Sequence, residues 1–245
     1  MTPTLIFLPG TLCDARVWRP VVDALRTEYP CAAAEYGDQD SIGAMASTMF
    51  ARISGPLVPV GLSMGGIVAL EMWRQAPQRI AAIGLCGTNP GADTAERKSA
   101  RALQLAAAQA DGLHALAEQR LAPAYFSARG ARLAQLAQTV AGMALDAGIA
   151  RLKAQSAALA TRADSWPTLA TITVPVLVSY GAKDTICPPQ EQRRMAAQIP
   201  RVSLHAISGA GHLAPLEQPA STVALMRAWL DEIGIPALKE PEERQ

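Results

Sequence analysis

The sequence predicts an α/β fold: a mostly parallel sheet of about six strands, with helices on both faces and an all-helical cap insertion. Three observations lead to this prediction. Short β-branched or apolar runs alternate with helical stretches, the pattern of a parallel sheet covered on both faces. The alternation stops between residues 91 and 166, where the chain is rich in alanine and has no convincing strand. A length of 245 residues, half of them apolar, suits one domain with an insertion.

The first part of the core begins with an apolar strand that Pro9-Gly10 stops. Asp14 is placed to cap the helix that follows, and Ser41 is placed to cap the next one. The predicted strands cover residues 4–8, 31–36, 57–61 and 80–85, and the predicted helices cover 17–28, 42–53 and 65–74.

The insertion divides the predicted core into two segments. Its helices are expected to break at Pro123 and Gly130. The sheet resumes with strands over 174–180 and 202–207, with a helix over 190–199 between them and a last helix over 221–233. We therefore expect a core of residues 1–90 and 167–235, a helical cap of residues 91–166, and a charged, flexible tail of residues 236–245.

Composition excludes several classes of partner. The 22 Lys and Arg residues nearly balance the 21 Asp and Glu residues, so no basic field is available for nucleic acid. No apolar run approaches the roughly 20 residues that span a bilayer, and the amino terminus does not resemble a signal peptide. The four cysteines have no metal-binding or redox spacing. We expect a soluble, cytoplasmic protein with no cofactor, no metal and no membrane or nucleic-acid partner.

The segment Gly61-Leu62-Ser63-Met64-Gly65-Gly66 carries the strongest chemical signal. It follows an apolar strand and begins a helix, the setting in which a strained turn lifts a serine hydroxyl above the sheet. Glycines on both sides suit such a turn, because a Cβ there would collide with the neighbouring strand and helix. Ser63 is therefore the candidate nucleophile; the alternative is a tight glycine turn with a helix-capping serine.

A serine nucleophile needs a base and an orienting carboxylate. His212 lies in a loop of small residues between the last strand and the last helix, which brings it to the carboxyl edge of the sheet. Asp184 follows the preceding strand, and the order Ser63, Asp184, His212 is the one expected for this type of triad. Asp93, after the strand at 80–85, is the alternative acid.

Two backbone amides should face the oxygen that becomes negative when the serine attacks. The Met64 amide lies at the amino end of a helix, whose dipole favours an anion. Gly10 allows the loop after the first strand to come close, and Thr11 in that loop is the candidate second donor.

These motifs resemble an α/β-hydrolase of the small cap-bearing esterase group, from Thr4 to about Trp229. Leu5 to Thr11 with Trp18 resembles the oxyanion loop, Gly61 to Gly65 the nucleophile turn, Val174 to Asp184 the acid strand and loop, and Gly211-His212 the histidine loop. Two departures stand out. Pro9 replaces a histidine common in the oxyanion loop, and the chain begins almost directly at the strand that is normally third.

The resemblance implies acyl transfer through a serine ester, because dehalogenases and epoxide hydrolases of this fold carry aspartate where this chain has Ser63. We expect a metal-free carboxylic ester hydrolase acting on a small-molecule ester with a small or medium acyl group. Three alternatives stay open: thioester, lactone or carbon–carbon bond hydrolysis; acyltransferase or perhydrolase activity; and a non-catalytic ligand receptor of the same fold. The chain is expected to be a monomer or a homodimer.

The pocket is expected to be formed mainly by the cap. Its nine Lys and Arg against six Asp and Glu are too small an excess to indicate an anionic substrate. Arg162 is expected to form a solvated pair with Asp164 or to orient an acidic group. The candidate pocket residues are Leu12, Trp18, Tyr125, Phe126, Met143, Trp166 and Leu213.

Overall fold

The computed structural model describes residues 2–238 and contains a six-stranded parallel sheet with the strand order β2-β1-β3-β4-β5-β6. The prediction of an α/β fold with about six strands is confirmed. The strands are β1 (Thr4–Leu8), β2 (Cys31–Ala33), β3 (Leu57–Leu62), β4 (Ile83–Cys86), β5 (Val176–Gly181) and β6 (Val202–Ile207).

Helices cover both faces of the sheet, as the alternating pattern predicted. The core helices are α1 (Arg19–Leu25), α2 (Ile42–Arg52), α3 (Met64–Gln75), α8 (Trp166–Leu169), α9 (Pro189–Ala196), α10 (Ala214–Glu217) and α11 (Pro219–Glu232). Alternate residues of β1 point to opposite faces, so Leu5 and Phe7 join one apolar cluster and Ile6 and Leu8 join the other. The first cluster packs under α1 and α11, and the second under α2, α3 and α9.

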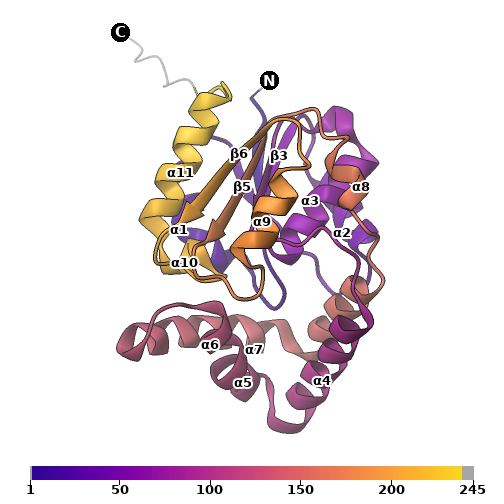
Figure 1. Ribbon diagram of the computed structural model, residues 1–245, viewed down its shortest axis with the longest axis vertical. Coiled ribbons are helices and arrows are strands. Elements are labelled where there is room, and N and C mark those ends of the chain that lie inside the picture. The colour runs from indigo at the N-terminus through magenta and orange to yellow at the C-terminus, as the bar shows by residue number, and fades with distance from the viewer. Residues whose placement is uncertain (1, 239–245) are drawn as a thin grey trace.

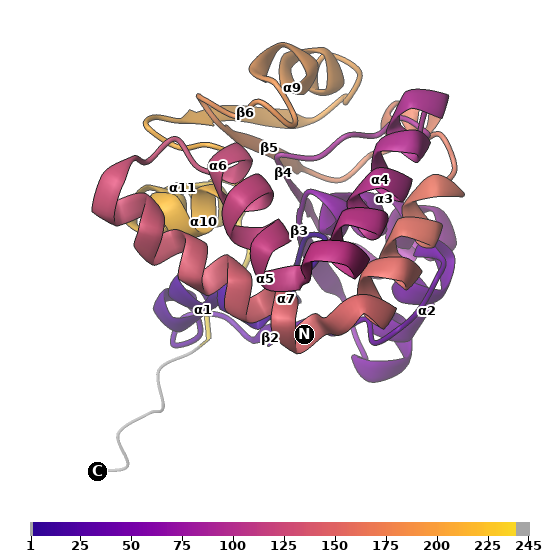
Figure 2. The same ribbon diagram turned by 90° about the horizontal axis from the view of Figure 1, so that it is seen from below.

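The cap consists of helices that lie across the carboxyl edge of the sheet. In Figure 1 the arrows of β5 and β6 point toward the cap, and Figure 2 shows the cap helices in front of the sheet. They are α4 (Ala95–Asp111), α5 (Leu113–Leu116), a π-helical turn (Ala117–Leu121), α6 (Ala122–Tyr125) and α7 (Gly130–Ala160). This arrangement leaves the loops after β1, β3, β4 and β5 under the cap.

Several predicted boundaries differ from the structure. Pro123 does not break the cap helix, because the π-helical turn before it places this proline in the first turn of α6, where an N–H is not needed. The predicted break at Gly130 is present, because α6 ends at Tyr125 and α7 begins at Gly130. Two further breaks lie at Gly112 and Gly148, whose φ values are +87° and +76°. The predicted helix over 17–28 is a 3₁₀ turn (Ala15–Val17) followed by the short α1, although Asp14 does accept a bond from the Arg16 amide.

Most of the predicted flexible tail, residues 239–245, lies outside the described residues. Leu238, the last described residue, donates its amide to the Glu28 carbonyl at 2.7 Å. Within residues 2–238, no helix combines the length and the apolar character needed to cross a membrane.

Candidate active site

Ser63 lies on a sharp turn between β3 and α3. Its φ of +54° is a left-handed conformation that residues other than glycine rarely adopt. A Cβ on Gly61 would lie 2.2 Å from the Gly65 backbone, and a Cβ on Gly65 would lie 2.1 Å from the Leu8 carbonyl. The two glycines therefore permit the close approach of strand and helix that the turn requires, and the Thr88 hydroxyl donates to the Ser63 carbonyl at 2.6 Å.

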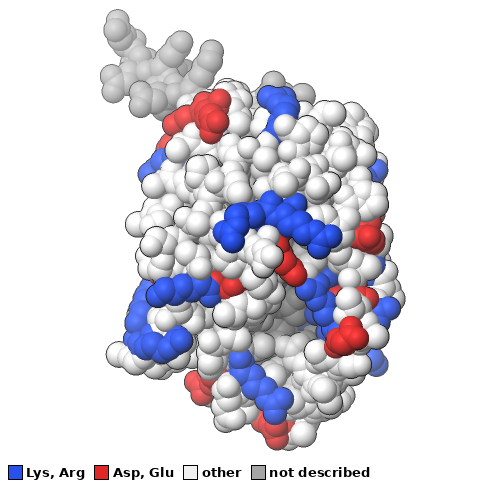
Figure 3. Space-filling model, viewed as in Figure 1, with Lys and Arg blue, Asp and Glu red and all other residues white. Residues whose placement is uncertain are grey.

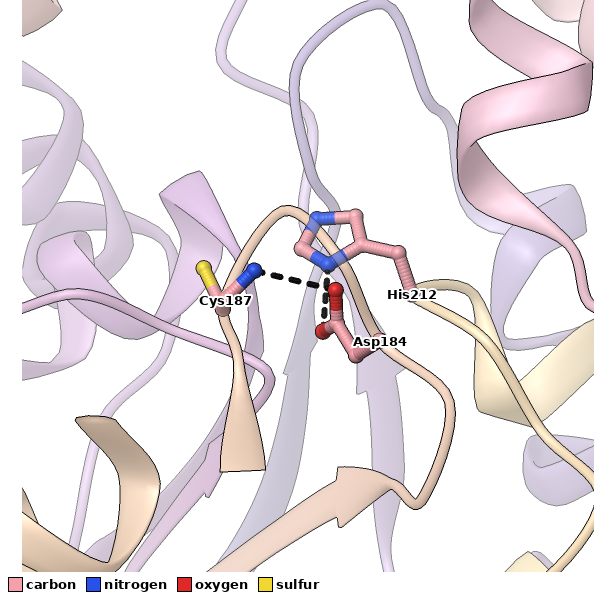
Figure 4. Close-up of side chains that lie close together, drawn as sticks. All are labelled: Asp184, Cys187 and His212. Carbon is pink, nitrogen blue, oxygen red and sulfur yellow. Dashed lines mark hydrogen bonds and ion pairs between the residues drawn. The ribbon is translucent and has the colours of Figure 1, made fainter. Parts of the chain in front are cut away.

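His212 and Asp184 form a buried pair on neighbouring loops (Figure 4). The imidazole Nδ1 lies 2.8 Å from Asp184 Oδ2, and the other ring nitrogen points away from the carboxylate. The second carboxylate oxygen, Oδ1, accepts the amides of Ile186 at 2.8 Å and Cys187 at 2.9 Å. These three bonds use both oxygens, so the carboxylate is fixed and in turn fixes the orientation of the ring.

The loop that carries His212 is tied to the cap. The His212 amide donates to the Tyr125 carbonyl at 2.6 Å, and the two rings lie 5.6 Å apart. Glu217, which is buried, accepts the Gly211 amide on one oxygen and the Ser127 hydroxyl and Ala128 amide on the other. Glu217 was not among the predicted site residues, and no local sequence pattern distinguishes it from a helix-capping glutamate.

The loop after β1 lies close to the turn that carries Ser63. Among residues 2–238, Leu12 and Ser63 are the two residues other than glycine with a positive φ. The Leu12 amide donates to the side-chain oxygen of Gln155, a buried residue of α7, at 2.9 Å. This bond from the cap holds the loop in its strained conformation beside the predicted oxyanion donors Thr11 and Met64.

A cavity of about 510 Å³ lies between core and cap, and Figure 3 shows a hollow there with basic side chains on its rim. Ser63 and His212 share its wall with Thr11 and Met64. No hydrogen bond joins the Ser63 hydroxyl to His212 in the described part of the chain. In the absence of substrate such hydrogen bonds are often long. The lining of one cavity by both Ser63 and His212 is what makes the pair a candidate nucleophile and base.

Of the seven predicted pocket residues, Tyr125 lines this cavity and the other six do not. Trp18 lies in the core, where its indole N–H donates to the Leu8 carbonyl and its ring packs 5.3 Å from Phe7. Trp166 is half-buried against the other apolar cluster, with Arg194 4.4 Å from the ring centre. Leu12, Phe126, Met143 and Leu213 are buried in the apolar cluster that joins cap and core.

Asp93, the alternative acid, has a different partner. Both of its oxygens bind guanidinium groups: Arg162 Nη1 at 2.8 Å from Oδ1, and Arg101 Nε from Oδ2. The expectation that Arg162 forms a solvated pair with Asp164 is wrong, because Arg162 is buried and also donates to the Gly91 carbonyl at 2.8 Å. Arg162 thus joins the two ends of the cap insertion, and it also lines the cavity.

Asp184, Cys187 and His212 place one potential metal ligand each within 4.8 Å of one another. Their chemistry fits a metal poorly. Nδ1 of His212 is already engaged by Asp184, and burial strongly raises the pKa of the Cys187 thiol, with the Asp184 charge adding to the effect. A metal binds the thiolate, which this environment disfavours. We assign the three residues no metal.

Comparison with known proteins identifies the family of this chain. Residues 5–225 match the model of the alpha/beta hydrolase family. The chain is 26% identical to a pimeloyl-[acyl-carrier protein] methyl ester esterase from Aromatoleum aromaticum over 91% of this chain and 96% of that protein. A malate-bound thermophilic esterase from Thermogutta terrifontis is 27% identical, with a TM-score of 0.85 over 94% of this chain and 90% of the esterase.

The enol-lactonase from Burkholderia xenovorans shares the fold at 21% identity, with a TM-score of 0.81 over 94% of this chain and 92% of the lactonase. The family match covers most of the chain, including the turn at Ser63, the Asp184 loop and the His212 loop. This protein therefore belongs to the alpha/beta hydrolase family.

Proposed function

We propose that this protein hydrolyses a carboxylic ester of a small or medium acyl group, with Ser63 as the nucleophile. One observation carries the proposal: Ser63, on a strained turn, shares a cavity wall with an imidazole whose far nitrogen is held by a buried carboxylate. The esterases at 26% and 27% identity support ester hydrolysis as the reaction. A cavity of about 510 Å³ suits a small-molecule substrate.

In the first half of the reaction, His212 Nε2 takes the proton from the Ser63 hydroxyl as Oγ attacks the ester carbonyl. The amides of Thr11 and Met64 stabilise the negative oxygen of the tetrahedral intermediate. When the intermediate collapses, the bond to the alcohol oxygen breaks and the alcohol leaves with the proton from His212. The product is an acyl group on Ser63.

In the second half, His212 takes a proton from water, which attacks the acyl carbonyl, and the acid is released as Oγ recovers its proton. Asp184 keeps the imidazole in the tautomer whose Nε2 accepts a proton, and it stabilises the imidazolium that forms in each half. No step needs a cofactor.

The test is hydrolysis of short-chain p-nitrophenyl esters by the purified protein and its Ser63→Ala variant. Removing the nucleophile should lower kcat by about 10⁴-fold or more, with the circular dichroism spectrum unchanged. Ser47→Ala, on the exposed surface of α2, is the matched control and should keep full activity. Undiminished turnover by the Ser63→Ala variant would refute the proposed function.

A further inference from the structure

Four arginines line the cavity beside Ser63, and no aspartate or glutamate does. Arg97 and Arg101 come from α4, Arg120 from the π-helical turn, and Arg162 from the segment after α7. Arg97 and Arg101 are one helical turn apart, but Arg120 and Arg162 lie far from them in the sequence, so the small excess of basic residues in the cap did not reveal the four as a group. The fold of the cap collects them on one wall.

The nearby carboxylates leave this wall positively charged. Asp93 is shared by Arg101 and Arg162, and Glu191 reaches Arg97 only at 4.0 Å from α9. Arg120 forms no ion pair with any residue in the range 2–238. Two carboxylates therefore face four guanidinium groups, and the guanidinium groups are the ones that line the cavity.

Arg162 is the most buried of the four arginines, and its surroundings disfavour the charged form of its guanidinium. Burial lowers the pKa of its guanidinium to about 10; Asp93 raises it, while the positive charges of Arg101 and Arg97 lower it further. Its Nε and Nη1 bind Gly91 and Asp93. A bound anion would offset the unbalanced positive charge, and guanidinium groups are well suited to pair with carboxylates and phosphates.

The cavity lining also includes apolar side chains. Leu116, Leu121 and Leu159 line the same cavity as the four arginines. An aliphatic chain is the natural occupant of such a surface. The cavity thus combines an acyl-transfer site, an apolar wall and a cationic wall.

We infer that the substrate is an ester that carries a second, anionic group, a carboxylate or a phosphate, bound by the cavity arginines Arg97, Arg101, Arg120 and Arg162 while its ester carbonyl lies at Ser63. This inference rests on the proposed function for its reaction, and it adds the class of substrate. Monoesters of aliphatic dicarboxylic acids are the simplest members of that class.

Three methyl esters with the same aliphatic chain test the inference: methyl hexanoate, monomethyl adipate and methyl 5-phosphonopentanoate. Methanol release gives kcat/KM for each. We expect one of the anionic esters to exceed methyl hexanoate by about 10- to 100-fold, the range for hydrogen bonds to a charged group. The better of the two identifies the anion as carboxylate or phosphate.

The double variant Arg97→Gln/Arg120→Gln should bring the ratio of anionic to neutral kcat/KM close to one. The matched control is Lys98→Gln/Lys153→Gln, which removes two charges from exposed positions of α4 and α7 that do not line the cavity. The control should keep the wild-type ratio. An equal ratio in both double variants, or faster hydrolysis of methyl hexanoate than of both anionic esters by the wild type, would overturn the inference.

A binding measurement separates this inference from the proposed function. Calorimetry with neutral hexanamide and with the anionic monoamides of adipic and 5-phosphonopentanoic acid needs no turnover. Preferential binding of an anion by the wild type, lost in Arg97→Gln/Arg120→Gln, supports the subsite even if no ester is hydrolysed. Serine-dependent hydrolysis of methyl hexanoate without any preference for the anionic ligands would leave the proposed function standing and remove the subsite.

Discussion

Asp184 and Asp93 are both buried aspartates on loops that follow neighbouring strands, β5 and β4, yet their partners differ in kind. Asp184 binds one imidazole and two backbone amides. Asp93 binds two guanidinium groups. An imidazole gains and loses a proton near neutral pH, whereas a guanidinium keeps its charge. The first aspartate therefore suits the role proposed for it, orienting the imidazole, and the second holds the two ends of the cap together.

Replacing Asp184 should have the largest effect, on activity alone. In Asp184→Asn the amide group donates to Nδ1, so the proton moves to Nε2 and the ring no longer accepts the serine proton. We expect kcat to fall by about 10⁴-fold. The side-chain oxygen of Asn still accepts the Ile186 and Cys187 amides. The free energy of unfolding, measured by urea titration, should therefore change by less than about 2 kcal/mol.

The same replacement at Asp93 should affect stability instead. Asp93→Asn leaves the buried Arg162 and its neighbour Arg101 without a balancing charge, which costs about 3–5 kcal/mol of unfolding free energy for a buried pair. Urea titration measures the change. The control is Asp164→Asn, at an exposed position in the same segment, which should change stability by less than about 0.5 kcal/mol. If the two variants unfold alike, the proposed role of Asp93 is wrong.

Glu217 combines the two kinds of role, because it joins the cap to the histidine loop. Glu217→Gln replaces an oxygen by an N–H₂ group that cannot accept the bonds from Gly211 or from Ser127 and Ala128. We expect a loss of about 1–3 kcal/mol in stability and a lower kcat through misplacement of His212. Glu232→Gln, exposed near the end of α11, should leave both unchanged. If the Glu217→Gln variant is as stable as the wild type and keeps full kcat, the His212 loop does not depend on Glu217 for its position.

Much of the core could be predicted from sequence because its signals are local. Apolar runs identified the strands, and the glycines around Ser63 and the small residues before His212 identified loops at one edge of the sheet. The contacts between cap and core are not local. Gln155 bonds to Leu12 across 143 residues, and Glu217 bonds to Ser127 across 90. Nothing near either residue in the sequence indicates its partner.

The cap was predicted less well because alanine is apolar on any face of a helix and gives weak information about which face is buried. Large residues such as Trp18 and Met143 were expected in the pocket and lie in the packed interior. Four arginines line the cavity instead, and of these Arg162 alone was a candidate for binding an acidic group. Arg162 in particular has an acidic neighbour in the sequence, Asp164, that is not its partner in the fold.

The smallest effect is expected at an ionic link that joins core and cap near the surface. Arg16 binds Asp14 in the core and Asp146 in α7, both through Nη2 at 2.5 Å. Burial would raise the pKa of Asp14, but hydrogen bonds from Arg16 and the Arg16 charge outweigh it and hold the pKa below its ordinary value of 3.8. A carboxyl with a lowered pKa in the folded state stabilises the protein above its unfolded-state pKa and loses that contribution as the pH falls.

Asp14→Asn should therefore cost less than about 1 kcal/mol at pH 7, because exposed pairs are screened by water and salt. The difference from wild type should shrink as the pH falls below the ordinary range of aspartate, since the wild-type carboxyl then takes up a proton too. Urea unfolding at pH 7 and near pH 3 measures it. If Asp14→Asn and Asp93→Asn lower the free energy of unfolding equally, burial does not determine how much these two ionic links stabilise the protein.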